Sequence, residues 1–174
     1  HNPSPYKFNK TSNFIKNKSF KFAYAGNIGE SQNLIEFCKI IKNINLNFEF
    51  YIIGSGSEKE KLENYIKKIN YEKKFIIKDH MTESQLKSYL VKMDGLFISL
   101  KSGKSLSKTL PGKLSMYLSF GKPIFSFAPG AVNQFIKRHN LGFYSKNYNE
   151  IENTFLKFYK MTIKEKKYFY KNSE

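Results

Sequence analysis

Short apolar segments alternate with helical patterns along most of this chain, and this alternation constrains its fold more than any other feature. Six apolar segments indicate buried strands, at residues 21–25, 48–53, 74–78, 95–100, 123–127 and 142–145. Helical spacing of apolar residues falls between them, at residues 32–44, 58–69, 83–93, 111–120 and 131–140. Strands that alternate with helices form parallel sheets covered on both faces, with right-handed crossovers. The sequence therefore predicts an α/β fold, a Rossmann-like doubly wound parallel sheet of about six strands with helices on both faces.

The size and hydrophobic content of the chain fit one such domain. Of its 174 residues 40% are hydrophobic and 17% aromatic, enough for a substantial core. We expect residues 1–19 to be a linker, residues 20–147 the α/β domain, and residues 148–174 two further helices. No apolar run approaches the ~20 residues of a membrane span, and no signal peptide is visible. Cys38 lies on the apolar face of the first expected helix, which indicates a core residue.

The net charge of +16 leaves three classes of partner open, namely nucleic acid, an anionic membrane and anionic substrates. Arg138 is the only arginine, whereas proteins that read nucleic-acid sequence rely on arginine forks. The lysines are scattered through every segment. We therefore expect a solvated lysine-rich surface and no nucleic-acid partner, while weak attraction to anionic lipid stays an alternative. The lysine- and aromatic-rich residues 164–171 could lie on such a lipid surface, although a packed helix is the stronger interpretation.

Glycine turns follow the first two expected strands. Gly26 and Gly29 end the first strand, and Ser31 is expected to cap a helix that follows at once. A strand, a glycine turn and a helix start together direct backbone N–H groups and the helix dipole at one spot, which suits an anion. Residues 54–56 form the second turn. It lacks the third glycine of a dinucleotide fingerprint because Lys59 stands there, which disfavours a nicotinamide or flavin cofactor.

Lysines gather where the fourth expected strand ends. They are Lys101, Lys104, Lys108 and Lys113. The third strand is followed by Asp79, His80 and Met81. The carboxyl ends of parallel strands meet at one edge of a sheet, so the lysines and both glycine turns are expected to share that edge. Lysine supplies charge to a diphosphate, and glycine lets the backbone approach it closely. These features predict a nucleotide or phosphate ligand.

Patterns typical of a catalytic centre are missing from the sequence. There is no His/Cys cluster with zinc spacing, no Gly-x-Ser-x-Gly elbow, no Walker loop, and no pair of carboxylates at the strand ends. We therefore assign no catalytic residue, no metal site and no cofactor.

Several motifs in combination resemble the C-terminal domain of GT-B glycosyltransferases. They are Tyr-Ala-Gly-Asn-Ile-Gly-Glu-Ser-Gln-Asn-Leu at 24–34, Ile-Gly-Ser-Gly at 53–56, Met-Asp-Gly-Leu-Phe-Ile at 93–98, Leu-Pro-Gly-Lys-Leu at 110–114 and Gly-Lys-Pro-Ile at 121–124. More narrowly, the combination is similar to a family 4-like branch that builds bacterial O-antigen and capsular polysaccharides. The resemblance runs from about residue 20 to residue 147. It implies one half of a GT-B fold, in which this domain holds a nucleotide-diphosphate sugar as the donor substrate.

The resemblance also implies site residues and partners. The diphosphate and sugar would contact Gly26, Asn27, Gly29, Gln32, Lys101 and Lys113. The nucleoside would contact Gly54, Asp79, His80, Met81 and Met116. We expect a UDP-sugar, transfer of a hexosyl or N-acetylaminosugar group with retention, and no cofactor. The other expected partners are an N-terminal GT-B domain that this sequence lacks, a lipid-linked glycan acceptor and an anionic membrane surface. A cytoplasmic location is implied, with peripheral attachment to the inner face of the membrane as an option.

Two departures from the family pattern bear on this site. Asn27 and Gln32 stand where the wider family has an arginine and a lysine, so positive charge must come from Lys101 and Lys113. Met116 stands where the wider family has a glutamate that reaches the ribose, and a thioether cannot replace that acceptor well. Without an N-terminal domain, this chain is expected to bind donor weakly and to transfer nothing.

Two alternatives differ from a donor-binding domain in function. A nucleotide-sugar epimerase shares the GT-B fold, but its Arg-Glu-Ser-Thr-Glu run is absent from this sequence. A non-enzymatic basic module that binds nucleic acid or anionic membrane is the other. Salt-dependent binding to DNA or to anionic liposomes would identify such a module.

Overall fold

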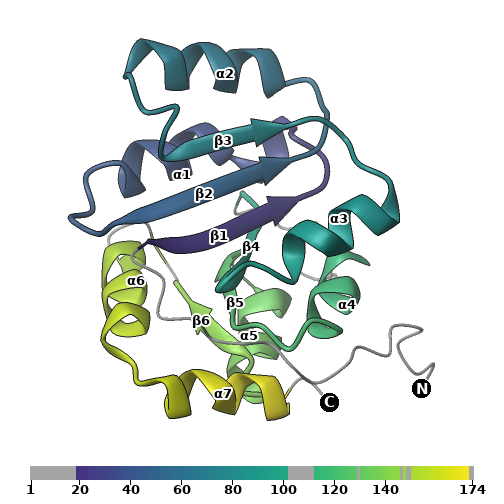
Figure 1. The fold of residues 1–174 in the computed structure, drawn as a ribbon, viewed down its shortest axis with the longest axis vertical. Helices are drawn as coiled ribbons and strands as arrows, with labels where there is room; N and C mark the ends of the chain where they lie inside the picture. The colour runs from purple at the N-terminus through teal and green to yellow at the C-terminus, as the bar shows by residue number, and fades with distance from the viewer. Residues whose placement is uncertain (1–18, 102–111, 129, 146, 148–149, 173–174) are drawn as a thin grey trace.

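The computed structural model is built around one parallel sheet and describes residues 19–101, 112–128, 130–145, 147 and 150–172. Its strands are β1 (Phe20–Ala25), β2 (Phe48–Ile53), β3 (Phe75–Lys78), β4 (Gly95–Ser99), β5 (Ile124–Phe127) and β6 (Gly142–Tyr144). They lie in the order β3-β2-β1-β4-β5-β6, and every neighbouring pair is parallel (Figure 1). The chain builds the sheet outward in opposite directions from β1 and β4. The point between these two strands is therefore the topological switch point, where α/β sheets bind ligands.

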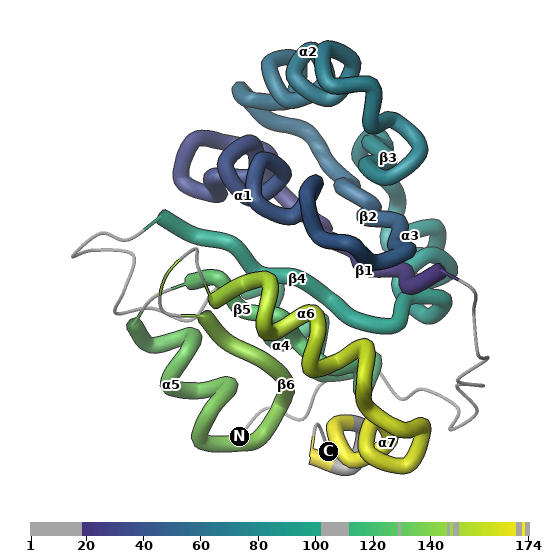
Figure 2. Tube along the Cα trace, turned by 90° about the vertical axis from the view of Figure 1, so that its left-hand side faces the viewer, coloured from purple at the N-terminus to yellow at the C-terminus, as the bar shows by residue number. Residues whose placement is uncertain are grey.

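Helices cover both faces of the sheet. They are the 3-10 turn η1 (Glu30–Gln32) and the α-helices α1 (Leu34–Ile41), α2 (Lys59–Lys68), α3 (Glu83–Leu90), α4 (Gly112–Leu118), α5 (Ala131–Arg138), α6 (Ile151–Lys160) and α7 (Ile163–Asn172). Buried side chains of α1, α2 and α6 form one core with the sheet, and those of α4 and α5 form another with the end of α3. Figure 2 shows α7 following α6 at one end of the molecule. The predicted doubly wound fold is confirmed.

The alternation of side chains along β1 explains why the two cores differ. Phe22 and Tyr24 point into the α1/α2/α6 core, where Phe22 packs edge-on against Phe125 and Phe155 at centroid distances of 5.1 and 4.8 Å. Ala23 and Ala25 point into the other core, where small side chains leave room for the helices to approach. Cys38 is fully buried in the first core, as predicted, and its burial raises the pKa of the thiol.

The first expected helix is the one clear error in the predicted elements. Residues 32–44 do not form one helix, because Asn33 takes a left-handed conformation with φ of 51° and separates η1 from α1. Ser31 therefore lies inside η1 and caps nothing. Its carbonyl accepts a hydrogen bond of 2.7 Å from the Lys101 amide, which ties η1 to the end of β4. Pro111, the expected first residue of the fourth helix, lies outside the described residues.

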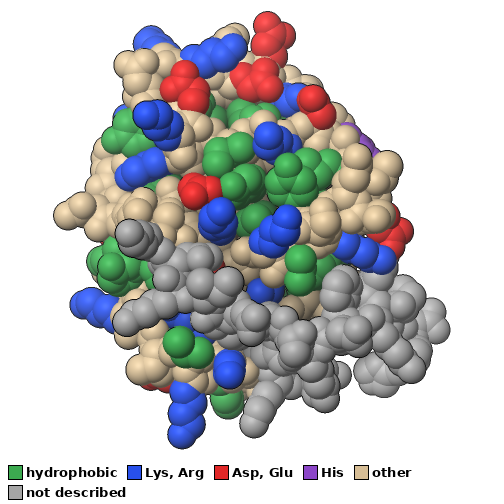
Figure 3. All heavy atoms as spheres, in the orientation of Figure 1, with side chains coloured by type: hydrophobic (Ala, Val, Ile, Leu, Met, Phe, Trp, Pro, Cys, Tyr) green, Lys and Arg blue, Asp and Glu red, His purple; other side chains and the backbone are tan. Residues whose placement is uncertain are grey.

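Positive charge is dispersed on the face of the molecule that Figure 3 shows. On the face in Figure 3, lysine side chains lie among acidic and apolar ones and form no single stripe. Within the described segments, no helix combines the length and the apolar character that crossing a bilayer requires.

Candidate functional site

The two glycine turns interlock at the carboxyl edge of β1 and β2. The Gly26 amide donates to the Ile53 carbonyl at 2.9 Å, and the Ile28 amide donates to the Ser55 carbonyl at 2.7 Å. A Cβ atom on Gly54 would lie 2.0 Å from the Gly26 carbonyl oxygen, and Gly54 has a φ of 151°. Only glycine fits this contact. The turns are glycine-rich because their backbones touch each other, a requirement that exists before any ligand binds.

This interlocking changes the expected source of hydrogen bonds for an anion. The Gly26 amide is taken by the end of β2 and the Ile28 amide by the neighbouring turn, and the Gly29 amide donates to Gln32 Oε1 at 3.1 Å. The same Gln32 oxygen accepts from Asn27 Nδ2 at 3.1 Å. Gly26, Asn27, Gly29 and Gln32 thus form one hydrogen-bonded loop. Their arrangement gives a preformed loop in which side chains already satisfy part of the backbone.

Lys113 reaches this loop from the first turn of α4. Its Nζ lies 2.6 Å from the Tyr24 hydroxyl oxygen and 3.9 Å from the centroid of the Tyr24 ring. A Cβ atom placed on Gly26 would lie 2.9 Å from the same Nζ, so the amino group rests directly against the Gly26 backbone. Among the described residues no carboxylate pairs with Lys113. Burial lowers the pKa of its amino group to about 8.

Two tyrosines support this lysine, and the sequence analysis missed both. The Tyr24 hydroxyl accepts from Lys113 and donates to the Asn27 carbonyl at 2.6 Å. Tyr117 lies one helical turn after Lys113, and its hydroxyl accepts a 2.8 Å bond from the Ala25 amide. Both side chains are fully buried. Two features of the sequence indicate this arrangement. A tyrosine in a buried strand needs a hydrogen-bond partner for its hydroxyl, and the four-residue spacing puts Tyr117 and Lys113 on one helix face.

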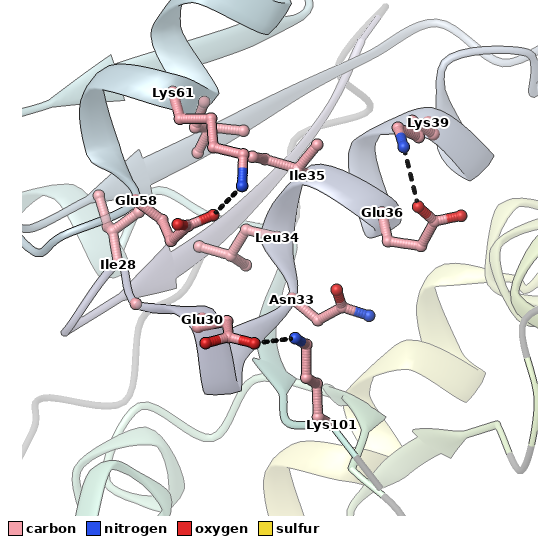
Figure 4. A pocket seen from close by; sticks show the side chains of 12 residues that line it. Ile28, Glu30, Asn33, Leu34, Ile35, Glu36, Lys39, Glu58, Lys61 and Lys101 are labelled. Carbon is pink, nitrogen blue, oxygen red and sulfur yellow. Dashed lines mark hydrogen bonds and ion pairs between the residues drawn. The ribbon is translucent and has the colours of Figure 1, made fainter.

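Lys101 lies at the same edge but in a different electrostatic setting. Its Nζ is 2.8 Å from Glu30 Oε1, on the outer side of the loop. The pair borders a hollow of about 390 Å³ between the start of α1 and the start of α2. Figure 4 shows Lys61 with Glu58 and Lys39 with Glu36 paired in the same way around this hollow. The lysines there are neutralised by carboxylates, so the hollow carries no spare positive charge.

The residues predicted for the nucleoside are less tightly grouped. Asp79 and His80 are exposed after β3, and Asp79 forms an ion pair with Lys59 at the start of α2. Met81 and Met116 are half-buried and pack against the core under α3 and α4. Gly54 stands between these groups and the Gly26 turn. The structure therefore shows Met81 and Met116 as apolar residues packed against the core. Asp79 is the residue of the predicted nucleoside set that carries a carboxylate.

The geometry fits anion binding better than acid–base chemistry. A cation without a carboxylate partner stands beside the backbone at the switch point, and no described carboxylate faces it. Within the described residues, no group of three His, Cys, Asp or Glu side chains is arranged to hold a metal ion. The site can attract and orient a phosphate group through Lys113 and the Asn27–Gln32 loop.

Comparison with known proteins finds a family match and solved structures with a similar fold. The sequence matches the family Glycosyl transferases group 1 over residues 6–174. The fold is similar to WaaG, a glycosyltransferase involved in lipopolysaccharide biosynthesis, with a TM-score of 0.70 and 11% identity over 91% of this chain and 42% of WaaG. It is similar to HepE of Anabaena in complex with UDP and glucose, with a TM-score of 0.72 and 10% identity over 90% of this chain and 42% of HepE.

A third relative is itself a domain. The C-terminal domain of LpcC, a glycosyl transferase group 1 family protein from Francisella tularensis, has a TM-score of 0.65 and 17% identity over 88% of this chain and 82% of that domain. Identities at this level show a common fold alone. The chain spans less than half the length of WaaG and HepE. A comparison with curated protein sequences found no match.

Proposed function

The chain belongs to the glycosyl transferases group 1 family, and we propose that it is the part of such an enzyme that binds the nucleotide-diphosphate sugar donor. Lys113 carries the proposal, because it is a half-buried cation at the switch point of the sheet and no described carboxylate pairs with it. A diphosphate is the ligand such a group suits best. We propose a UDP-sugar as donor, which is in keeping with the UDP in the HepE structure.

The donor would lie across the carboxyl ends of β1 and β4. Lys113 neutralises the diphosphate, and the loop of Asn27 and Gln32 supplies hydrogen bonds beside it. When the sugar leaves, negative charge grows on the departing UDP. A fixed cation at that position stabilises this charge without reorganising, which lowers the barrier to transfer. Gly54, Asp79, His80 and Met81 would border the nucleoside.

The ribose would be held without the family glutamate. Met116 is half-buried against the core, so its contribution is apolar contact with the nucleoside. Asp79 is the carboxylate we propose as hydroxyl acceptor in its place. Its ion pair with Lys59 holds the pKa of the Asp79 carboxyl below its usual range, so the group stays ionised and able to accept.

The finer assignment concerns the whole enzyme and its pathway. We propose a retaining transferase of the family 4-like branch that builds bacterial surface polysaccharides, moving a hexosyl or N-acetylaminosugar group. The acceptor, a lipid-linked glycan, would be bound by an N-terminal GT-B domain, and this chain alone would bind donor and transfer nothing. The enzyme would work in the cytoplasm, with an anionic membrane surface as an option for peripheral contact. We propose no cofactor and no nucleic-acid partner.

Calorimetric titration with UDP, GDP and dTDP tests the proposal. We expect UDP to bind, and Lys113→Met to weaken it at least about tenfold, the effect of one charge-assisted hydrogen bond. Lys67→Met is the matched control, because Lys67 is an exposed lysine near the far end of α2. Absence of any response at millimolar UDP, GDP and dTDP would overturn donor binding. Equal losses in the two variants would show that general charge, rather than the site, attracts the nucleotide.

A further inference from the structure

The Tyr24 hydroxyl is held between two partners in a fixed orientation. Its proton is committed to the Asn27 carbonyl, 2.6 Å away, and its oxygen receives the Lys113 amino group at 2.6 Å. Burial raises the pKa of Tyr24, so the hydroxyl keeps its proton and cannot reverse this arrangement by ionising. Tyr24 therefore presents a lone pair to Lys113 and fixes the amino group against Gly26.

The surroundings of Lys113 contain little else that could hold its charge. The groups packed against it are the Tyr24 ring and hydroxyl and the backbone of Gly26. Tyr117, on the same helix face, is bonded to Ala25. No described carboxylate or second lysine perturbs the Lys113 amino group, and burial is what lowers its pKa. Among the described residues no negative charge contacts this amino group, so an arriving diphosphate would supply one.

We propose that Tyr24 is the positioning residue for Lys113, and that donor binding is coupled to the uptake of a proton by the Lys113 amino group. This inference rests on the proposed function, because it takes a nucleotide diphosphate as the ligand. The proton comes from solvent and is released to it when the nucleotide leaves. No covalent bond forms or breaks. Tyr24 acts through Lys113 and has no contact with the ligand in this scheme.

The coupling has a definite direction. Below pH 8 the amino group is charged in the free protein, and the nucleotide binds it directly. Above pH 8 the free protein must first gain a proton, so affinity falls as the pH rises, by up to about tenfold per pH unit until the pKa of the bound state is reached. An enzyme with this site would bind donor tightly at neutral pH and release UDP more readily in alkaline conditions.

Titration of UDP at pH 6.5 and pH 8.5, in buffers of different ionisation enthalpy, measures the proton uptake. We expect almost no uptake at pH 6.5 and most of one proton per UDP at pH 8.5. Lys113→Met removes the uptake and so accounts for protons taken by UDP itself. In Lys113→Arg the guanidinium stays charged, so affinity should be nearly constant between these pH values.

Tyr24→Phe tests the positioning role, since it keeps the ring and loses the hydroxyl. Without its acceptor, the charged amino group is less stabilised, so the pKa of Lys113 should fall further and UDP binding at pH 7.5 should weaken about threefold to tenfold. Tyr51→Phe is the matched control, because it removes a hydroxyl bonded to Glu49 on the neighbouring strand β2. Tyr51→Phe should leave the pKa of Lys113 and the affinity for UDP unchanged.

The outcomes separate this inference from the proposed function. NMR titration of the lysine side chains follows the pKa of Lys113 in the free protein, with Lys113→Met identifying the signal. If UDP does not bind, the proposed function fails, and a Lys113 pKa that is equal in wild type and Tyr24→Phe then also overturns the positioning role. If UDP binds without pH-dependent proton uptake, the coupling is wrong and donor binding stands. If Tyr24→Phe does not fold, the contrast between wild type and Lys113→Arg still decides the coupling.

Discussion

Lysines pack against the sheet at both of its edges, half-buried at the carboxyl edge and buried at the amino edge, and they differ in the carboxylates near them. At the carboxyl edge, Lys113 rests on a tyrosine and no described carboxylate pairs with it. At the amino edge, Lys122 and Lys166 are 6% and 9% exposed and lie close enough to Asp94 to lower the pKa of its carboxyl. Burial of the Asp94 carboxyl acts against the two lysines and raises its pKa on balance. Among the described residues, a carboxylate therefore acts on the buried lysines of the amino edge and none acts on Lys113, although burial lowers the pKa of all three lysines.

The amino edge is organised as a structural junction. The Lys21 amide donates to Asp94 Oδ2 at 2.8 Å, and the Asp94 amide donates to the Lys21 carbonyl at 2.7 Å. Lys166 comes from α7, and its Nζ lies 4.5 Å from the ring centroids of Phe20 and Phe158. Asp94 thus joins β1, the start of β4 and the last helix.

The difference teaches how to separate a structural lysine from a ligand-binding one. A buried cation that folding has already paired gains little from an added anion. An unpaired buried cation destabilises the free protein, and an anion relieves that penalty. The cation with the largest desolvation cost and no counter-charge should therefore mark the ligand site, because active sites commonly lose stability in exchange for function.

Asp94→Asn should have the largest effect on stability. It removes the carboxylate whose charge acts on two buried lysines, and loss of such a charge partner lowers the free energy of unfolding by about 3 kcal/mol. Asparagine keeps an acceptor for the Lys21 amide. Urea unfolding measures the loss, and UDP affinity of the folded protein should change less than twofold. Glu63→Gln, which removes an exposed carboxylate paired with Lys59, is the control and should leave the urea midpoint nearly unchanged. A mild effect of Asp94→Asn would remove the distinction between the edges.

Lys113→Met should act in the opposite direction on stability. Lys113 is a half-buried cation that no described carboxylate pairs with, so replacing it by an apolar side chain of similar length should raise the free energy of unfolding at pH 7 by about 1 kcal/mol. The same variant should bind UDP at least about tenfold more weakly. Thermal unfolding with and without UDP reports both effects in one experiment. Strong destabilisation by Lys113→Met would show that the lysine is part of the scaffold.

The fold could be predicted from the sequence because its signals are local. The predicted bounds of β2 agree with the structure, since the apolar run ends at a glycine that touches the neighbouring turn. The break at Asn33 could not be seen. Leu34, Phe37 and Cys38 continue a helical spacing, whereas the hydrogen bond that holds η1 in place comes from Lys101, far along the chain.

The candidate site was predictable in part for the same reason. Lys113 and the glycines were identified by residue type and by their place after strands. The role of Tyr24 was not, because tyrosine in a strand is commonly a core residue and its lysine partner lies 89 positions away. The source of hydrogen bonds was also misjudged. The Gly26 amide serves the end of β2 and the Ile28 amide the neighbouring turn, a pairing that depends on the tertiary contact between the two loops.

The pH dependence of stability offers a finer comparison of the two lysine environments. The pKa of Lys113 is about 8 in the folded protein, below its ordinary value of 10.5, so the folded state binds fewer protons between these values. Burial of the charged Lys113 amino group lowers the free energy of unfolding. This loss is complete below about pH 8 and disappears as the pH rises toward 10.5. The stability advantage of Lys113→Met over wild type should therefore shrink across this range. Urea unfolding at pH 7, 8.5 and 9.5 measures it, and an advantage that grows with pH would contradict the assignment.

Lys101 provides the smallest expected effect and the strictest test, because it shares the carboxyl edge with Lys113 but has a carboxylate. Its ion pair with Glu30 is exposed, so Lys101→Met should weaken UDP binding less than threefold. Glu30→Gln should free Lys101 and tighten UDP binding slightly, an effect that high salt removes. Calorimetry at low and high salt distinguishes these variants from Lys113→Met, because Lys113 is half-buried and salt screens its charge less than that of Lys101. If Lys101→Met were as damaging as Lys113→Met, position at the edge rather than lack of a counter-charge would determine which lysine binds the nucleotide.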